Sequence, residues 1–199
     1  TCALPIYEIA ELKFVALDTD RARTGAATRQ CVLARDDALA VRVPLVRRAL
    51  VWVGHVQTRN RGTVGGSLAH ADPAAELPLV ARMLDAQIQV RSTRGARTLA
   101  ANEFFVGPLT TALEADECLE AITWPAWRDA RTGSAFTEVS RRHGDFALVA
   151  ACAQIALDAG GRCTRAAFGL AGGGTVPLAF PAIAAKRSEE HTSELQSRF

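Results

Sequence analysis

Residues 57–78, QTRNRGTVGGSLAHADPAAELP, constrain this chain more than any other stretch. Gly65 and Gly66 stand together, and without a Cβ their backbone can turn sharply and lie directly on a ligand. Thr63 and Ser67 add hydroxyl groups on either side of the pair. The segment therefore predicts a binding loop for an anion such as a nucleotide diphosphate. By spacing alone, a plain surface loop is an equally good interpretation.

The residues after this loop indicate a helix start. Asp72 is a good N-cap, and Pro73 is preferred at the first helical position. A helix that begins after a glycine-rich loop offers N–H groups and the positive end of its dipole to an anion. Pro78 cannot sit deep in a helix, so either a short turn ends there or the main helix begins there.

The rest of the chain alternates short strand and helix patterns. A hairpin is expected from Leu12–Leu17 and Ala22–Ala27, and helices from 28–35, from 44–53 with Gly54 as the stop, and near 73–84. A second hairpin is expected from 87–91 and 97–100, followed in 101–107 by a helical turn that enters a loop. Further strands are expected at 118–124, 134–142, 148–157 and 163–170, although the pattern of 147–157 also suits a helix.

Composition excludes several classes of function. Apolar residues make up 49% of the chain and charged residues 22%, which is ordinary for a globular domain. A formal net charge of +2 is too weak to indicate a nucleic-acid or anionic-membrane partner. No apolar run reaches the roughly 20 residues that a membrane-spanning helix needs.

Cysteine and histidine spacing does not favour a metal. Cys31, Cys118, Cys152 and Cys163 are far apart and form no CxxC, which indicates reduced thiols and a cytoplasmic protein rather than an iron–sulfur cluster. The residues His55, His70, His143 and Asp72 lack the spacing of a metal-binding motif, so no metal site and no nucleophilic or acid–base catalytic residue is predicted.

Four segments together resemble one known family. They are RNRGTVGGSLAHADPAAELP, ANEFFVGPLTTAL (101–113), ECLEAITWP (117–125) and SRRHGDFALVAACAQIAL (140–157). The chain is similar to the FAD-binding medium subunits of molybdenum hydroxylases, the family of carbon monoxide dehydrogenase and xanthine dehydrogenase. The resemblance implies an α+β fold: an α/β-type FAD-binding domain of the PCMH type, and part of a smaller α+β C-terminal domain.

The resemblance also implies a set of cofactor-binding residues. The family's second glycine-rich loop matches Thr63 to Ser67, whose hydroxyls and backbone amides would hold the diphosphate of FAD. Glu76 stands where the family more often has Asp, on the adenosine side, and Leu119 would lie near the flavin ring. The expected cofactor-binding residues are Thr63, Val64, Gly65, Gly66, Ser67, Glu76 and Leu119.

The resemblance implies an electron-transfer role. Electrons would pass from iron–sulfur clusters on a small subunit, by way of FAD on this subunit, to an external acceptor. Molybdopterin would lie on a large subunit, so the expected assembly is a heterotrimer that can pair further, with only FAD on this chain. The alternatives are a stand-alone PCMH-type flavin oxidoreductase and an inactive truncated fragment.

Both ends of the chain resemble translated sequencing adapters. TCALPI (1–6) and RSEEHTSELQS (187–197) match such adapters, so we expect native sequence from about Tyr7 to Lys186. The expected domains are 7–126 for FAD binding and 127–186 for the C-terminal part, with the boundary in WPAWRDARTG. The family's first glycine-rich loop would precede Tyr7, so we expect the chain as given to bind FAD more weakly than the intact subunit.

Overall fold

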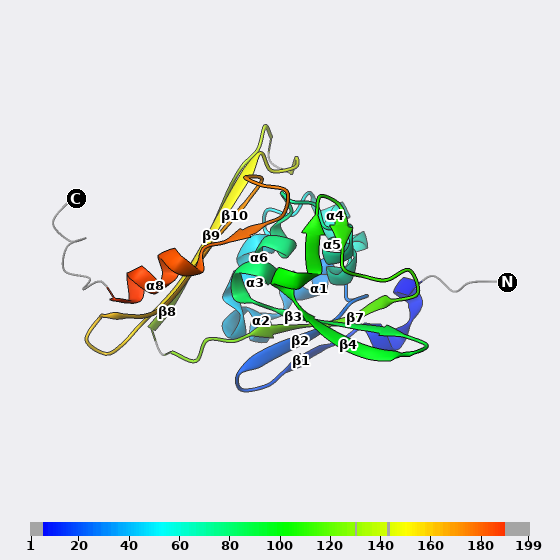
Figure 1. The fold of residues 1–199 in the computed structure, drawn as a ribbon, viewed down its shortest axis with the longest axis horizontal. Coiled ribbons are helices and arrows are strands. Elements are labelled where there is room, and N and C mark those ends of the chain that lie inside the picture. Colours follow the sequence, from blue (N-terminus) through cyan, green and yellow to red (C-terminus); the bar gives the residue numbers. More distant parts are fainter. Residues whose placement is uncertain (1–5, 130, 143, 190–199) are drawn as a thin grey trace.

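The computed structural model describes residues 6–129, 131–142 and 144–189, and the backbone alone for 187–189. Two units follow one another along the chain, each built on its own antiparallel sheet (Figure 1). No helix within the described ranges is both long and apolar enough to cross a bilayer.

The first unit is built on a sheet whose described strands run in the order β1-β2-β7-β3-β4. Every neighbouring pair is antiparallel, and β7 lies between the two hairpins β1–β2 and β3–β4. In β3 the side chains of Ile88 and Val90 are fully buried, as their alternation predicts. The strands are β1 (Val15–Leu17), β2 (Arg21–Gly25), β3 (Gln87–Ser92), β4 (Gly95–Ala100) and β7 (Cys118–Pro125).

Short helices cover one face of this sheet and bury the core (Figure 1). Inside that core the Trp124 indole N–H donates to the Thr24 hydroxyl at 3.0 Å, which ties β7 to β2. Two 3-10 turns, η1 (Ile6–Glu8) and η2 (Ala10–Leu12), precede β1. The helices are α1 (Gln30–Arg35), α2 (Asp37–Arg42), α3 (Pro44–Leu50), α4 (Val56–Arg61), α5 (Val64–His70) and α6 (Glu76–Leu84).

A small ribbon follows the β3–β4 hairpin. Helix α7 (Ala101–Phe104) leads into β5 (Phe105–Gly107) and β6 (Thr110–Thr111), which pair antiparallel. The Leu109 amide in the turn of this ribbon donates to the Ala71 carbonyl at 3.0 Å, so the ribbon is tied to the end of α5. The helical turn predicted at the start of 101–107 is thus confirmed, whereas the loop predicted after it is the strand β5.

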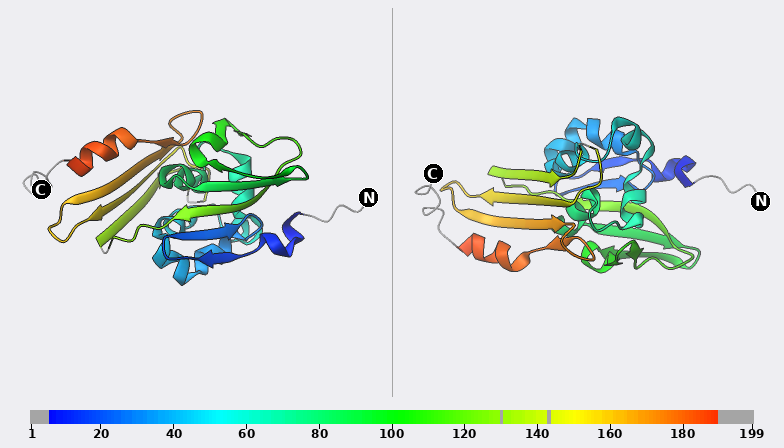
Figure 2. Two further views of the ribbon diagram at one scale, coloured as in Figure 1. Left: turned by 60° about the horizontal axis from the view of Figure 1, so that its bottom comes forward. Right: turned by 90° about the horizontal axis from the view of Figure 1, so that it is seen from above.

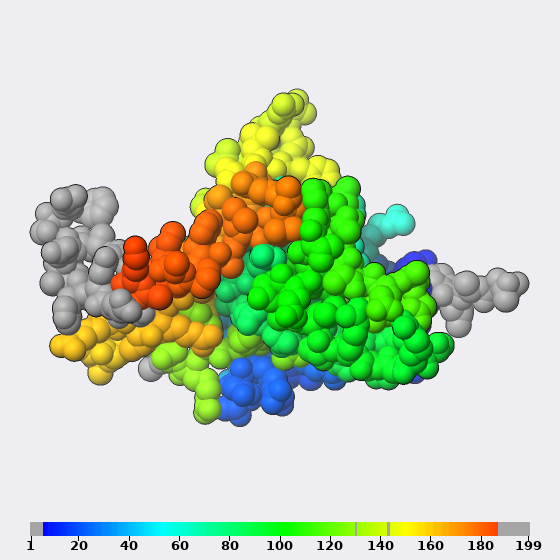
Figure 3. Space-filling model, in the orientation of Figure 1, coloured from blue at the N-terminus to red at the C-terminus, as the bar shows by residue number. Residues whose placement is uncertain are grey.

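The second unit is a meander of strands with a helix beside it. It comprises β8 (Arg131–Val139), β9 (Val149–Leu157), β10 (Cys163–Ala171), β11 (Leu178–Ala179) and α8 (Pro181–Glu189), and α8 packs against β10 (Figure 2). Residues 149–157 form a strand, which decides the strand-or-helix alternative. The end of the β8–β9 hairpin projects beyond the first unit (Figure 3).

The observed fold confirms the α+β class and corrects three details. The first sheet is antiparallel throughout, so this part of the chain does not contain the parallel strands of an α/β domain. Helix α6 begins at Glu76 rather than at Pro73. Pro78 occupies its first turn, where the backbone N–H that proline lacks would have no partner within the helix. Asp72 does not cap a helix: its Oδ1 accepts from the Ala74 amide at 2.9 Å in a local turn.

Candidate functional site

The Gly65-Gly66 pair lies in the first turn of α5. The sequence predicts a loop at this position, and the structure has the start of a helix instead. Thr63 is the N-cap: its backbone is extended, and its hydroxyl oxygen accepts from the Gly66 amide at 3.0 Å. The Val64 amide donates to the Thr28 carbonyl at 3.0 Å, and the Gly65 amide to the Ala26 carbonyl at 2.8 Å. These three amides are therefore already hydrogen-bonded within the chain.

The two glycines are needed for close approach rather than for a sharp turn, because neither has a positive φ. A Cβ on Gly65 would lie 2.5 Å from the Ala26 Cβ and 2.9 Å from the Ala26 carbonyl oxygen. A Cβ on Gly66 would lie 2.8 Å from the Thr63 hydroxyl and would displace the cap. The pair thus lets the start of α5 pack closely against the end of β2, with only backbone atoms on the helix side of the contact.

A pocket of about 290 Å³ opens at this helix start. It collects residues from η1, the end of β2, the start of α5 and the segment that enters β7. Its walls are mostly apolar, which suits a flat ring more than a charged group. The lining residues are Ile6, Tyr7, Leu12, Ala26, Ala27, Thr63, Gly65, Gly66, Ala69, Leu113, Glu117, Cys118 and Leu119.

The structure thus brings four of the seven predicted site residues into one pocket. Thr63, Gly65, Gly66 and Leu119 line it, although Leu119 is more than 50 positions away in the sequence. Val64 is fully buried, so it presents only backbone. Ser67 is half-buried one helical turn after Thr63, on the same side of α5.

Glu76 lies away from this pocket, at the first position of α6. Burial raises the pKa of its carboxyl from 4.5 to about 7, and the nearby charges of Glu138 and Asp72 act in the same direction. Glu138 is a buried residue of β8, so this acidic group lies where the two units meet. The sequence offers no periodic signal for that contact, because it joins residues 62 positions apart.

Glu117 and Cys118 are pocket residues to which the sequence analysis gave no role. The Arg97 guanidinium holds the pKa of the Glu117 carboxyl at about 2, helped by the Glu114 amide. Burial, and then the charge of Glu120, raise the pKa of the Cys118 thiol, which disfavours the reactive thiolate. Both residues fall in the ECLEAITWP segment, so the family resemblance was the signal available for them.

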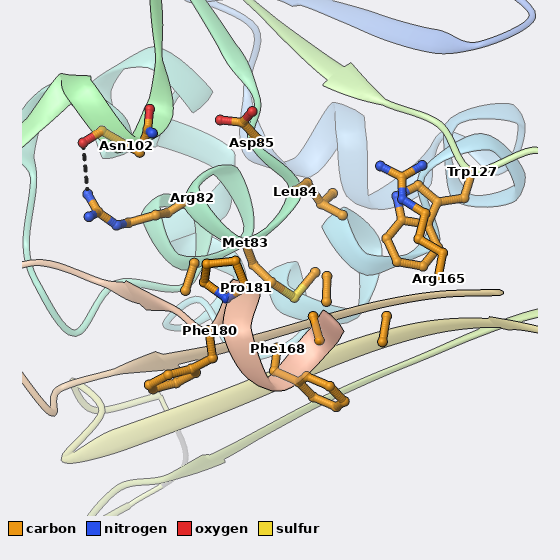
Figure 4. A pocket seen from close by; sticks show the side chains of 14 residues that line it. Arg82, Met83, Leu84, Asp85, Asn102, Trp127, Arg165, Phe168, Phe180 and Pro181 are labelled. Atoms are coloured by element: carbon orange, nitrogen blue, oxygen red, sulfur yellow. Dashed lines mark hydrogen bonds between the residues drawn. The ribbon is translucent and has the colours of Figure 1, made fainter. Parts of the chain in front are cut away.

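A larger cavity of about 600 Å³ lies elsewhere, between α6, β10 and α8 (Figure 4). The Arg165 guanidinium stacks over the Trp127 ring at 4.2 Å, and Arg82 donates to the Asn102 carbonyl at 3.3 Å. None of the predicted site residues lines this cavity. Size alone therefore does not identify the site, and the chemistry of the α5 start favours the smaller pocket.

The histidines that the structure describes do not gather with other potential metal ligands. A Cβ on Gly144 would lie 2.5 Å from the His55 ring, so His55 packs against the β8–β9 connection. His70 is exposed at the end of α5, and His143 lies outside the described residues. Within the part of the chain that the structure describes, no three His, Cys, Asp or Glu side chains come together as metal ligands do.

Comparisons with known proteins point to one family. A family model described as the FAD binding domain in molybdopterin dehydrogenase matches residues 2–127, which include the whole α5 pocket. The chain is 39% identical over 154 residues to subunit alpha of the 6-hydroxypseudooxynicotine dehydrogenase complex of Paenarthrobacter nicotinovorans, covering 77% of this chain and 52% of that protein. It is 36% identical over 181 residues to caffeine dehydrogenase subunit beta of Pseudomonas sp. strain CBB1, covering 90% of this chain and 61% of that one.

Solved structures show the same fold. Carbon monoxide dehydrogenase from Hydrogenophaga pseudoflava superposes with a TM-score of 0.88 at 29% identity, over 95% of this chain and 66% of that one. Quinoline 2-oxidoreductase from Pseudomonas putida 86 superposes with a TM-score of 0.81 at 33% identity, over 87% and 60% of the two chains. The chain spans about half to three fifths of the length of the curated relatives described above. With the family model matched over more than half of its residues, the chain belongs to the FAD-binding domains of the molybdopterin dehydrogenases, a family of oxidoreductases.

Proposed function

We propose that FAD binds along α5, with its diphosphate beside the hydroxyls of Thr63 and Ser67. Because the amides of Val64, Gly65 and Gly66 are already bonded, the hydroxyls of Thr63 and Ser67 supply the hydrogen-bond donors there. The Thr63 oxygen accepts from Gly66, which leaves its own hydrogen for a phosphate oxygen. The pocket at this helix start, lined by Thr63, Gly65 and Gly66, is the observation that supports this placement.

We propose further that the two ends of FAD lie at the two ends of α5. The apolar pocket at Leu119 suits the flavin ring, and Glu76 lies beyond the other end of the helix, toward the adenosine. With seven residues, α5 is about 10 Å long, which an extended dinucleotide can span. When bound, FAD supplies one-electron and two-electron redox chemistry, while the chain binds, orients and shields it.

For the whole protein we propose the electron-transfer subunit of a molybdenum hydroxylase. Relatives are named as a medium chain of carbon monoxide dehydrogenase and a medium subunit of nicotine 6-hydroxylase, which supports a place between a large and a small subunit. Cys31, Cys118, Cys152 and Cys163 are free thiols, which favours the reducing cytoplasm as the compartment. We also propose residues 7–126 and 127–186 as the two domains, since β7 ends at Pro125 and β8 starts at Arg131.

Thr63 tests the placement of FAD. Thr63→Ala removes both the helix cap and the phosphate donor, so FAD affinity is expected to fall about tenfold and stability by about 1 kcal/mol. Thr63→Ser keeps the hydroxyl and should keep both the FAD affinity and the stability of the unmodified chain. Titration of the chain with FAD, followed by flavin fluorescence, measures the dissociation constant, and urea unfolding measures stability.

Asp36→Ala is the matched control for the lost cap. Asp36 caps α2 in the same way, accepting from the Leu39 amide at 2.8 Å, but it does not line the α5 pocket. It should lose similar stability and keep its FAD affinity. Equal affinity of Thr63→Ala and the unmodified chain would contradict the proposed site.

A further inference from the structure

One wall of the α5 pocket is an irregular segment held by two arginines of the β3–β4 hairpin, Arg94 and Arg97. Residues 112–117 connect β6 to β7, and this segment with the start of β7 carries Leu113, Glu117, Cys118 and Leu119 to the pocket. A segment with no strand or helix of its own needs side-chain contacts to keep one conformation.

Arg94, in the turn of the hairpin, donates to the exposed carboxylates of Glu114 and Asp116 in the middle of the segment. Arg97, on the neighbouring strand β4, makes the contacts at both ends of it. Its Nε donates to Glu117 Oε1 at 2.6 Å and its Nη2 to Glu117 Oε2 at 2.7 Å. The same Nη2 donates to the Ala112 carbonyl at 2.9 Å, and the Glu114 amide donates to Glu117 Oε2 at 2.8 Å. The guanidinium fork thus fixes the position of the carboxylate and closes the segment on itself.

This ion pair differs in burial from its neighbours on the same hairpin. The Glu117 side chain is 6% exposed and that of Arg97 is 40% exposed, whereas the Glu120 side chain is 21% exposed and that of its partner Arg91 is 56% exposed. Exposed pairs contribute little, but a carboxylate kept from water depends strongly on its cation. Glu117 also faces the pocket, while Glu120 and Arg91 do not line it.

We propose that Arg97 is a positioning residue for FAD: it holds residues 112–119 as the wall of the pocket and neutralises a carboxylate that would otherwise face an anionic cofactor. The inference rests on the proposed placement of FAD in the α5 pocket. Arg97 does not line that pocket and acts through Glu117.

A double-mutant cycle on FAD binding tests the inference with the full chain. Arg97→Ala leaves the Glu117 charge without its partner, so FAD affinity should fall at least about tenfold, equivalent to ~1.4 kcal/mol. Arg97→Lys keeps the charge without the fork and should recover part of the loss. Glu117→Gln keeps the shape and removes the charge, so it should lose less FAD affinity than Arg97→Ala does.

The double variant separates positioning from general destabilisation. With the unpaired carboxylate removed, Arg97→Ala with Glu117→Gln should bind FAD more tightly than Arg97→Ala alone. Arg91→Ala is the matched control, because it breaks an ion pair between the same two sheet regions away from the pocket, and it should bind within about twofold of the unmodified chain.

Two results would overturn the inference: Arg97→Ala binding FAD as tightly as Arg91→Ala, or the double variant binding no better than Arg97→Ala. Both leave the proposed function standing, provided that Thr63→Ala still loses affinity. If the Thr63 variants show that FAD binds elsewhere, the placement of FAD fails and this inference fails with it.

Discussion

At the scale of single residues, Thr63 combines two roles in one hydroxyl. Its oxygen caps α5 by accepting from Gly66, and its hydrogen remains available on the side of the pocket. Gly65 and Gly66 make room for this arrangement, because any side chain there would strike Ala26 or the cap itself. These three residues thus form a stable helix start and, at the same time, one wall of an open pocket.

Glu76 makes a pH-dependent prediction at the same scale. Because burial raises its pKa to about 7 in the folded chain, the folded state holds the proton more tightly than the unfolded state does. The stability contributed by neutral Glu76 is present below its ordinary pKa of 4.5 and is lost as the pH rises to about 7. Glu76→Gln should therefore be more stable than the unmodified chain at pH 8.

The difference should close as the pH falls toward 4, because Glu76 is then neutral in both states. Urea unfolding without FAD at pH 4, 6 and 8 measures it. Glu103→Gln, at an exposed position of α7, is the control and should show no such trend. An advantage of Glu76→Gln that stays constant over this range would contradict the shifted pKa.

At the scale of elements, alternation and hairpin turns predicted the strands well, and cap chemistry predicted the helices less well. β3, β4 and β7 lie where their apolar alternation and the stop at Pro125 place them. The start of α5 was missed because Thr63 is an ordinary cap, whereas a Gly-Gly pair is poor helix material that only tertiary contact with Ala26 stabilises. Asp72-Pro73 was wrongly predicted to start a helix, because the Asp72 carboxylate accepts a hydrogen bond within a local turn and caps no helix.

The ends of α5 and α6 make an element-scale prediction. Ala71 and Asp85 both terminate a helix in the left-handed conformation, with φ of 52° and 55°. Asp85 is exposed and carries a negative charge at a helix C-terminus, so Asp85→Gly should stabilise the chain by about 1 kcal/mol. Thermal unfolding measures the change.

Ala71→Gly is the matched comparison. It relieves the same backbone conformation but removes a methyl group that is 2% exposed, which costs about 0.8 kcal/mol. Its net effect should therefore be small. If Asp85→Gly destabilised the chain, the assignment of this cap would be wrong.

At the scale of the whole molecule, the two sheets share one hydrophobic core. Cys152 of β9 contacts Met83 of α6, with their sulfur atoms 3.3 Å apart, and the Gly172 amide donates to the Pro73 carbonyl at 3.1 Å. These contacts, like the pairing of β7 with β2, join residues about 70 to 100 positions apart. Sequence periodicity carries information only about residues close together in the chain. Only the family resemblance could therefore predict that Leu119 lies near the Thr63 end of α5.

Gly172 tests the cooperation of the two units. Its φ is +78°, and a Cβ would lie 2.4 Å from the Leu148 carbonyl oxygen, so Gly172→Ala should destabilise the chain by about 2–3 kcal/mol. Because the core is shared, circular dichroism and tryptophan fluorescence should still report one common unfolding transition. Gly133→Ala, whose Cβ would meet nothing within 4 Å, is the control. Two separate transitions in the unmodified chain would contradict a shared core.

The most direct test of the central claim is a crystal structure of this chain with FAD bound. We expect the diphosphate within hydrogen-bond distance of the Thr63 and Ser67 hydroxyls, and the flavin ring against Leu119. A diphosphate bound away from the start of α5, for example beside Arg82 and Arg165 in the larger cavity, would contradict the account.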